Sequence, residues 1–459
     1  MRGRAPADAG AGLLRAAILV LLAAGPLLFG AVHEPVFIPL LLGCGLVGLA
    51  AFFRTRRSER EGRARAPLPG RGLLLSLHGL LAFQLVPMPP GVLRALSPGS
   101  YSFYNDPLLL PPLTAWKPIS VSPPDTLRGL AFLAAFSLLY LAVFREMGAH
   151  PWRRRLMRAV VGTGVAITVV ALLQAVSPEP RKVYGLWRPQ WDWAVFGPYV
   201  NRSHFSGYLV MAAPLGIGFA LEALLRLRRA WGNRPRGWLV LGDAEGAVAV
   251  RWAAVAVVLV AGLLAAQSRG AVSAFALAAL SLPLVSRRRR RTALVVVVVV
   301  GLGIAWIGLG GVVGGFEARG IRASRLNLWA DMLPIVPRFP VFGVGWNAFS
   351  TAYPWYQTVL KDLWVGEAHN DYLQVLLDGG LLGLSIVLCL LALVFRAALA
   401  RASRDPLDLG LFGALLGLAF HEVVDFNGQI PANAATWVAL AALALAGGRG
   451  SGPPAERLG

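Results

Sequence analysis

One histidine ends a long polar stretch in an otherwise hydrophobic chain. The stretch runs from about Phe316 to Asp371, lies between two apolar runs, and closes on His369-Asn370-Asp371-Tyr372. Histidine titrates near neutral pH, so a positioned imidazole is suited to act as a general base. Asparagine and aspartate are also common N-caps, which leaves a capping cluster with an incidental histidine as the alternative. We take His369 as the candidate catalytic residue and Asn370 and Asp371 as candidate substrate contacts.

A single arginine lies in a very short turn between two other apolar runs. The turn is Gln267-Ser268-Arg269-Gly270. A guanidinium binds phosphate through two parallel hydrogen bonds and stays charged at any relevant pH, so Arg269 is a candidate anion clamp. Gly270 would let a ligand or another backbone approach closely. The alternative is an arginine that extends toward lipid headgroups.

A second candidate anion-binding arginine lies inside the polar stretch. Arg325 and Trp329 are spaced i and i+4, so a helix would present both on one face. That pair fits a pyrophosphate contact beside an aromatic side chain, and it also fits a cation–π pair on a surface helix. Arg322, about one turn earlier, is a candidate second phosphate contact.

Two further polar clusters interrupt the apolar sequence. Asn201, Arg202 and His204 enter one apolar run and are candidate substrate contacts. His421-Glu422 and Asp425-Phe426-Asn427 form another cluster, to which the sequence assigns no role. At least two arginines and two histidines are therefore expected to gather on one side of the molecule.

The elements that must position these residues are membrane helices. Hydrophobic residues make up 56% of the 459 residues and charged residues 15%, against about 25% charged in soluble proteins. A span needs about 20 mostly apolar residues. The candidate spans are roughly 13–31, 36–53, 72–87, 126–144, 156–176, 205–225, 250–267, 270–285, 292–315, 371–396, 407–421 and 431–447. We predict an all-α integral membrane protein with about twelve transmembrane helices, residues 1–459 forming a single polytopic domain.

The arginine clusters predict its orientation. The formal net charge of +21 comes from short basic clusters between apolar runs, which is the pattern of cytoplasmic loops rather than of a nucleic-acid surface. The main clusters lie within 54–71, 145–155, 226–236, 287–291 and 396–404. An even span count then places both termini in the cytoplasm. The loop 316–370, which we expect to contain short helices, and the candidate site would face the other side.

These motifs together resemble the O-antigen ligase and polymerase superfamily of bacterial membrane glycosyltransferases. The similarity is clearest over about 195–435. The matching strings are residues 197–208, Ser268-Arg269-Gly270, Arg325 with Trp329, residues 342–345, residues 369–374 and residues 425–434. Ser203 departs from the family pattern, where many members have asparagine.

The resemblance implies transfer of a glycan from an undecaprenyl-pyrophosphate carrier to an acceptor hydroxyl, without a metal or another cofactor. It implies a bacterial inner-membrane protein of lipopolysaccharide biosynthesis, with its active site facing the periplasm and lipid A-core, another glycan or a protein as acceptor. It also implies Arg269 and Arg325 as pyrophosphate-binding residues and His369 as the essential loop histidine. Polymerase and protein O-oligosaccharyltransferase activities remain alternatives. A lipid-linked glycan transporter is the non-enzymatic alternative, although we find neither a polar path through the spans nor related halves.

Overall fold

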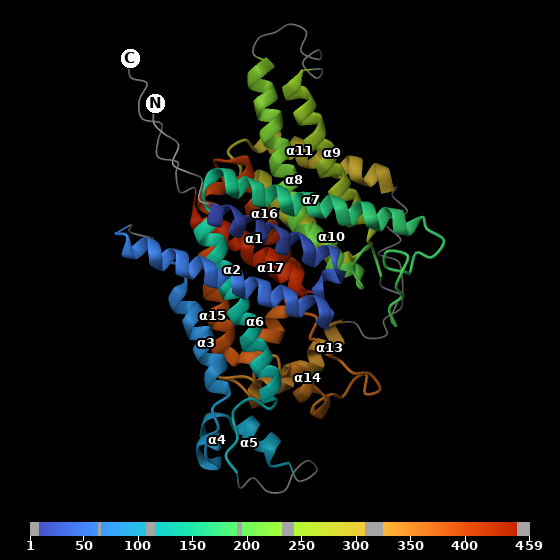
Figure 1. Cartoon of the computed structure of the whole chain (residues 1–459). Helices are drawn as coiled ribbons and strands as arrows, with labels where there is room; N and C mark the ends of the chain where they lie inside the picture. The colour runs from blue at the N-terminus through green and yellow to red at the C-terminus, as the bar shows by residue number, and fades with distance from the viewer. Residues whose placement is uncertain are drawn as a thin grey trace.

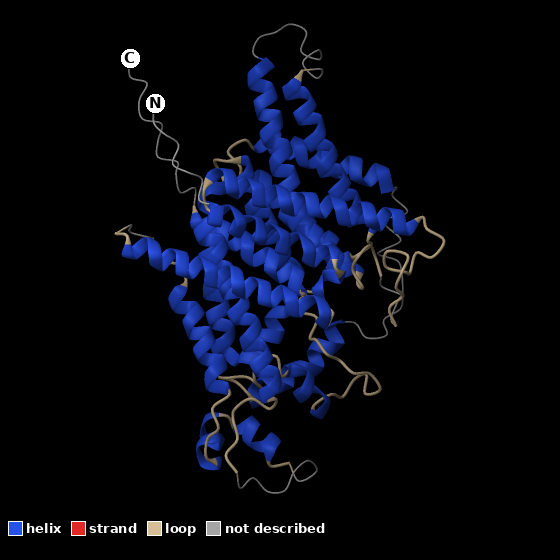
Figure 2. Cartoon of the chain, viewed as in Figure 1, coloured by secondary structure: helices blue, strands red, loops and turns tan. Residues whose placement is uncertain are grey.

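The protein is a bundle of α-helices. The computed structural model describes residues 9–62, 66–106, 115–190, 195–231, 243–307 and 325–447. Within those ranges Figure 2 shows helices and loops and no strand. The predicted all-α class is therefore confirmed.

Twelve helices coincide with the twelve predicted spans. They are α1 (Ala9–Leu27), α2 (Glu34–Arg60), α3 (Arg71–Gln84), α6 (Pro123–Glu146), α7 (His150–Ala175), α8 (Arg202–Trp231), α9 (Ala244–Ala265), α10 (Arg269–Val285), α11 (Arg289–Ile307), α15 (Asp371–Ala402), α16 (Pro406–His421) and α17 (Pro431–Ala446). Seven of them (α1, α2, α6, α7, α8, α9 and α15) are long and apolar enough to cross a membrane, and α10, α16 and α17 are shorter apolar helices. The fold is that of a multi-pass membrane protein.

Short helices lie in the connections at one set of helix ends. They are α4 (Pro90–Leu96), α5 (Pro98–Tyr104), α13 (Arg325–Met332) and α14 (Phe349–Ala352), with the short 3-10 helices η1 (Phe29–Ala31), η4 (Leu333–Arg338), η5 (Tyr353–Trp355) and η6 (Asn427–Gln429). Figure 1 shows α4, α5, α13 and α14 below the bundle, whereas α8 and α9 project above it. We call the helix ends that carry these short helices the loop ends. The opposite ends, where the arginine clusters lie, are the arginine-rich ends.

Helix α8 is the central element and packs along both α9 and α16. Its side chains Phe205, Tyr208 and Phe219 are almost completely buried. A Cβ added to Gly410 of α16 would lie 3.2 Å from the Cα of Gly218 in α8, so small residues let the two helices approach closely. Because α8 and α16 run antiparallel, the start of α8 lies beside the end of α16.

A break in α15 holds the polar loop in place. Gly380 has φ +64°, a left-handed conformation that favours glycine. A Cβ there would lie 2.3 Å from the carbonyl oxygen of Val341. The amide of Leu381 donates to the Pro340 carbonyl at 2.8 Å. The first part of α15 is thereby fixed against residues 340–345.

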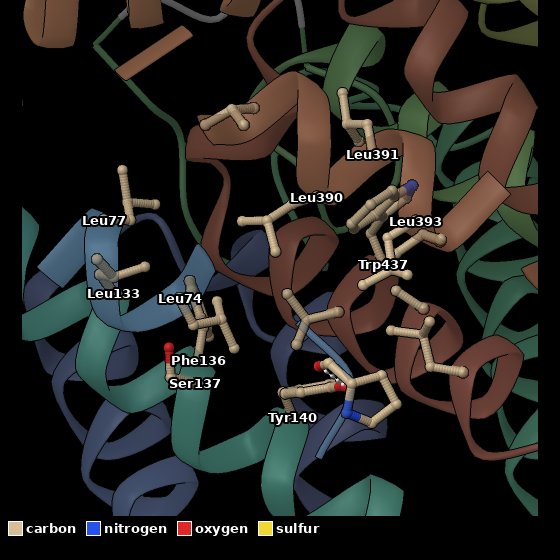
Figure 3. A pocket seen from close by; sticks show the side chains of 16 residues that line it. Leu74, Leu77, Leu133, Phe136, Ser137, Tyr140, Leu390, Leu391, Leu393 and Trp437 are labelled. Atoms are coloured by element: carbon tan, nitrogen blue, oxygen red, sulfur yellow. Dashed lines mark hydrogen bonds between the residues drawn. The ribbon is translucent and has the colours of Figure 1, made fainter. Parts of the chain in front are cut away.

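An apolar cavity of about 200 Å³ lies among α3, α6, α15 and α17, lined mostly by apolar side chains that include seven leucines, Phe136 and Trp437 (Figure 3). One of the polar contacts at its wall is the Tyr140 hydroxyl, which donates to the Pro69 carbonyl at 2.7 Å. Its nearest α15 residue, Val387, is roughly 24 Å along the helix from Asp371 at 1.5 Å per residue. Such a lining offers mainly van der Waals contact and includes no His, Asp, Glu, Lys or Arg side chain.

Candidate active site

His369 ends the polar loop immediately before α15. Its φ of +52° is left-handed, which is uncommon for a non-glycine residue and recurs at functional sites. Its ring packs edge-on against Phe426 with centroids 4.9 Å apart, and its Nδ1 is buried without a hydrogen-bond partner among the described residues. Burial and the Arg325 charge lower the pKa of His369, while Asp425 opposes them. The imidazole is therefore neutral near pH 7, the state that a general base requires.

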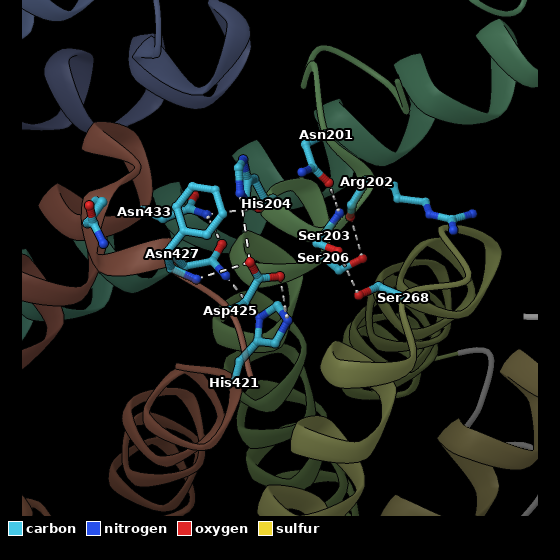
Figure 4. Close-up of polar contacts among 12 residues, drawn as sticks. Asn201, Arg202, Ser203, His204, Ser206, Ser268, His421, Asp425, Asn427 and Asn433 are labelled. Carbon is cyan, nitrogen blue, oxygen red and sulfur yellow. Dashed lines mark hydrogen bonds and ion pairs between the residues drawn. The ribbon is translucent and has the colours of Figure 1, made fainter. Parts of the chain in front are cut away.

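The carboxylate of Asp425 lies at the centre of the cluster. Its oxygens are 3.5 Å from His421 Nε2, 3.9 Å from His204 Nε2 and 3.8 Å from Arg325 Nη2. Figure 4 shows Asp425 between His204 and His421. Burial raises the pKa of Asp425, but His421, His204 and Arg325 outweigh burial and the net effect is a lowered pKa. A buried anion thus lies among three side chains able to carry positive charge.

Helix α13 brings Arg325 into this cluster. Trp329 Nε1 donates to the carbonyl oxygen of Ala368 at 2.8 Å, which ties α13 to the residue before His369. Arg325 lies one turn earlier, and 38% of its side chain is exposed. Both residues of the i, i+4 pair thus point toward the His369 segment, and the guanidinium keeps an open side for a ligand.

A network of amide side chains holds the turn that carries Asp425. Asn433 Nδ2 donates to Asn427 Oδ1 and to the His204 carbonyl, both at 2.8 Å. The Tyr199 hydroxyl donates to Asn433 Oδ1 at 2.9 Å, and Asn427 Nδ2 is 3.2 Å from His421 Nδ1. Every member is buried, so each of these polar groups needs the partner it has. The network joins the start of α8 to the turn between α16 and α17.

Arg269 begins α10 beside the same turn. A Cβ on Gly270 would lie 2.8 Å from Val424 and 3.5 Å from the His421 ring, so the first turn of α10 packs directly on residues 421–424. Ser268 Oγ is 3.2 Å from Ser203 Oγ at the start of α8 (Figure 4). The side chain of Arg269 is exposed. The α9–α10 turn is as short as the sequence predicts.

Three of the candidate substrate contacts are engaged by the protein itself. Asn370 caps α15, accepting a hydrogen bond from the Leu373 amide at 3.0 Å. Asn201 Oδ1 accepts from the Ser203 amide at 2.8 Å at the start of α8. Asp371 accepts from the Gly428 amide at 2.8 Å and from Gln429 Nε2 at 2.9 Å. Asp371 therefore fastens the first turn of α15 to the α16–α17 turn, and its carboxylate is occupied.

The other candidates differ in their surroundings. His204, from α8, is buried, and its ring also packs edge-on against Phe426, with centroids 4.7 Å apart. Arg202 is half-buried at the first position of α8. Arg322 lies outside the described residues. His204 therefore joins the cluster of His369, Arg325 and Asp425, which the sequence analysis could only place on the same side.

Several polar atoms of the cluster are buried without a hydrogen-bond partner among the described residues. They include both ring nitrogens of His204, His421 Nε2, Asp425 Oδ2 and both carboxyl oxygens of Glu422. Burial and the neighbouring Asp371 raise the pKa of Glu422 well above its usual range, so this carboxyl is neutral. Within the described residues no three His, Cys, Asp or Glu side chains are arranged to hold a metal ion. Unsatisfied buried groups cost about 1–3 kcal/mol each, so their concentration here points to a functional site.

The central position of Asp425 and His421 in the cluster was not predicted from the sequence. The signal was present, since both lie in the polar break 421–427 between two apolar runs, four residues apart. Nothing in a one-dimensional pattern says that this break faces Arg325, 100 residues earlier, or His204, more than 200 residues earlier.

Comparison with known proteins yields one family. The model of the O-antigen ligase family matches residues 254–388. The match runs from within α9 to within α15 and contains Arg269, Arg325 and His369, so the resemblance predicted from the motifs is confirmed over that range. No curated protein matches the chain.

Proposed function

Starting from an O-antigen ligase match that contains Arg269, Arg325 and His369, we propose that this protein is a glycosyltransferase. It moves a glycan from an undecaprenyl-pyrophosphate carrier to an acceptor hydroxyl at the periplasmic face of a bacterial inner membrane. The observation that carries the proposal is the convergence of His369 and Arg325 on buried Asp425, which combines a neutral base with an anion-binding cation.

The arrangement of the helix ends supports this topology. The cluster is built from the loop ends of α8, α10, α15 and α16, whereas the arginine clusters lie at the opposite ends. The positive-inside rule puts arginine-rich ends in the cytoplasm. The candidate site then faces the periplasm, about twelve helices cross the membrane, and both termini are cytoplasmic.

The reaction is a displacement at the anomeric carbon of the first sugar. The acceptor oxygen attacks opposite the pyrophosphate and inverts the anomeric centre. As the new C–O bond forms, the bond to the bridging pyrophosphate oxygen breaks and its electron pair stays on the pyrophosphate. His369 takes the proton of the acceptor hydroxyl, and such positioned bases contribute roughly 10²–10⁴-fold.

The arginines act on the leaving group. Negative charge grows on the bridging oxygen as the bond breaks, so guanidinium groups placed there bind the transition state more strongly than the ground state. Arg325 is held near Asp425 but not tightly paired with it, which leaves its hydrogen-bond donors available to phosphate. Arg269, at the start of α10, would take the other side of the pyrophosphate.

The direct test is transfer by the purified protein in lipid vesicles, with carrier-linked glycan as donor and lipid A-core as acceptor. His369→Ala and Arg269→Ala, inserted at normal levels, should lose nearly all transfer. Arg94→Ala is the matched control, because Arg94 is an exposed arginine at the loop ends, stacked on Tyr101 and outside the cluster. Full activity of either site variant would overturn the assignment.

Deletion of the gene would identify the acceptor. Unmodified core with accumulated carrier-linked glycan indicates the ligase. Core capped with a single repeat indicates a polymerase, and altered glycoproteins indicate a protein O-oligosaccharyltransferase. Carrier-linked glycan retained on the cytoplasmic leaflet would instead indicate a transporter and refute the transferase.

A further inference from the structure

A second polar surface lies on the loop that follows α14. A groove of about 400 Å³ is lined there by Pro354, Gln357, Lys361, Asp362, Leu363 and Trp364. In Figure 1 this loop projects from the body of the molecule beside α14. None of these residues belongs to the cluster around Asp425.

The loop is held in one shape by two polar side chains. Asp331 of α13 accepts hydrogen bonds from the Thr358 amide at 3.0 Å, the Thr358 hydroxyl, and the Tyr353 hydroxyl at 2.7 Å. Gln357 Nε2 donates to the carbonyl oxygens of Val359, Leu360 and Leu363 at 3.0, 2.7 and 3.2 Å. Although partial burial raises the pKa of Asp331, these hydrogen bonds lower it overall, so the carboxylate that anchors the loop is ionised.

Apolar contacts connect the loop to the candidate active site. Val359 and Val365 pack against the hydrophobic cluster that contains Leu328, Ala368 and Leu373. Those residues also support α13 and the segment around His369. The groove therefore has a fixed position relative to His369, so binding would involve only a small entropic cost for ordering the loop.

The groove presents unpaired polar groups beside an open aromatic face. Trp364 is 71% exposed. Neither Lys361 nor Asp362 forms an ion pair with another described residue, although they are adjacent and of opposite charge. Gln357 Oε1 accepts no hydrogen bond from the described residues, and the side chain is held through Nε2 alone. One donor, two acceptors and one indole face thus point into the same 400 Å³.

We propose that the groove at Trp364 binds a saccharide unit of one of the two glycan substrates. A pyranose ring has an apolar C–H face that packs on an indole, whose π face is electronegative, and a rim of hydroxyls that need both donors and acceptors. The groove supplies both an indole face and polar donors and acceptors, on a loop that Asp331 and Gln357 hold in place. The choice of a glycan ligand rests on the proposed function.

The distance to the active site fits this role. Trp364 and His369 are five residues apart, so their Cα atoms are at most about 17 Å apart along the chain. A sugar held at Trp364 would therefore lie within the same glycan as the reacting hydroxyl or the reacting anomeric carbon. The groove would set which glycan is accepted.

The experiment measures binding without transfer. The full-length protein in nanodiscs is titrated calorimetrically with two soluble probes, released by mild acid from the lipopolysaccharide of the source bacterium. One probe is the core oligosaccharide and the other is the O-polysaccharide. We expect one of them to bind, and Trp364→Ala to weaken that binding about tenfold. Binding of the core would assign the groove to the acceptor, and binding of the O-polysaccharide would assign it to the donor glycan.

Trp116→Ala is the matched control, because Trp116 is a tryptophan outside the groove and is 64% exposed. It should bind the probe as the wild type does. Binding of neither probe by the wild type, or equal binding by Trp364→Ala, would overturn the proposal. Brominated lipids quench the fluorescence of tryptophans that touch the membrane. If Trp364→Ala loses part of that quenching but binds the glycan as the wild type does, Trp364 is a membrane-interface anchor instead. Since no carrier lipid is present, failure of the transferase assignment would leave this binding result standing.

Discussion

Buried charges occur at both ends of the bundle, but they are paired in different ways. At the arginine-rich ends, Arg154 of α7 holds Glu222 of α8 through two hydrogen bonds of 2.7 and 2.8 Å. Arg153 is likewise bonded to Asp408. At the loop ends, His204, His421 and Arg325 stand 3.5–3.9 Å from Asp425, and Asp425 Oδ2 has no hydrogen-bond partner among the described residues.

The difference separates charges that hold the fold from charges that could serve a ligand. A partly buried ion pair needs good geometry to offset its desolvation, and the Arg154–Glu222 pair has that geometry. The Asp425 cluster lacks such close pairing, and Arg325, His369 and His204 therefore keep unused hydrogen-bonding capacity. A ligand can supply the missing contacts at the loop ends, whereas none is needed at the arginine-rich ends.

The largest expected effect is on catalysis at the loosely paired end. Arg325→Gln should lower the transfer rate by about 10²–10³-fold, as loss of one preorganised donor to a developing anion does. Its melting temperature should stay near that of the wild type, because the contact with Asp425 is long and the side chain is 38% exposed. Arg325→Lys keeps the charge but loses the fork geometry of the guanidinium, so its transfer rate should lie between those of the wild type and Arg325→Gln. Unchanged transfer by Arg325→Gln would remove the distinction between the two ends.

At the tightly paired end the effect should be on stability. Glu222→Gln leaves Arg154 without its carboxylate, so the free energy of unfolding should fall by about 1.5–3 kcal/mol, measured by chemical denaturation in detergent. Activity per folded molecule should not change. Glu59→Gln is the control, because its pair with Arg56 at 3.5 Å is exposed and worth little. A Glu222→Gln protein that is stable but inactive would contradict the comparison.

The pH dependence of transfer sharpens the comparison within the cluster. Because the pKa of His369 is lowered below its usual 6.5, the base should stay active into mildly acidic solution. The Arg325 charge contributes to that lowering, so Arg325→Gln should move the acidic limb of the kcat/KM profile to higher pH. Asp425 acts in the opposite direction, so Asp425→Asn should move the limb to lower pH. Shifts of the same sign in both variants would show that His369 is not the titrating base.

The smallest effect should come from Glu367, two residues before His369. Burial and the carboxylates of Asp378 and Asp371 raise the pKa of Glu367 to about 8 from an ordinary 4.5. Stability from this group is therefore complete below pH 4.5 and is lost as the pH rises to 8, because the unfolded chain releases the proton first. Glu367→Gln, which cannot ionise, should melt on the order of 2 °C above the wild type at pH 9 and together with it at pH 5. Equal melting temperatures at both pH values would count against a buried, neutral Glu367.

The existence and order of the twelve helices were predictable, with ends that differ by up to about seven residues, and the reason is local. A span in lipid must satisfy every backbone amide within its own helix, so an apolar run of sufficient length has one available structure. Residues 126–144 and 156–176 became α6 and α7 with slightly longer bounds. The break of α15 at Gly380 was not predicted, because it depends on the approach of Val341 from another segment.

The site was predicted in part. The types and positions of Arg325 and His369 marked them as candidates for anion binding and acid–base catalysis. The short turn at Arg269 was predictable from the apolar runs on either side. The roles of Asn370 and Asp371 required the structure, since an N-cap and a carboxylate that fastens two turns look alike in sequence. Asp371 reaches Gly428 and Gln429 only because α15 and α16 pack side by side.

The sequence by itself determined a helical membrane protein, the ends at which its arginines gather, and the residue types that could perform acid–base and anion chemistry. Each of these follows from periodicity, length and composition, which are properties of neighbouring residues. The tertiary structure alone decided that Asp425 lies among His204, Arg325 and His421, and that the rings of His204 and His369 both pack edge-on against Phe426. Those contacts join residues up to 221 positions apart in the sequence and arise where the start of α8 packs on the turn after α16, so closely that a Cβ on Gly207 would overlap Asn427. Close helix packing depends on the shapes of two surfaces together, and the pattern of one surface does not specify its partner.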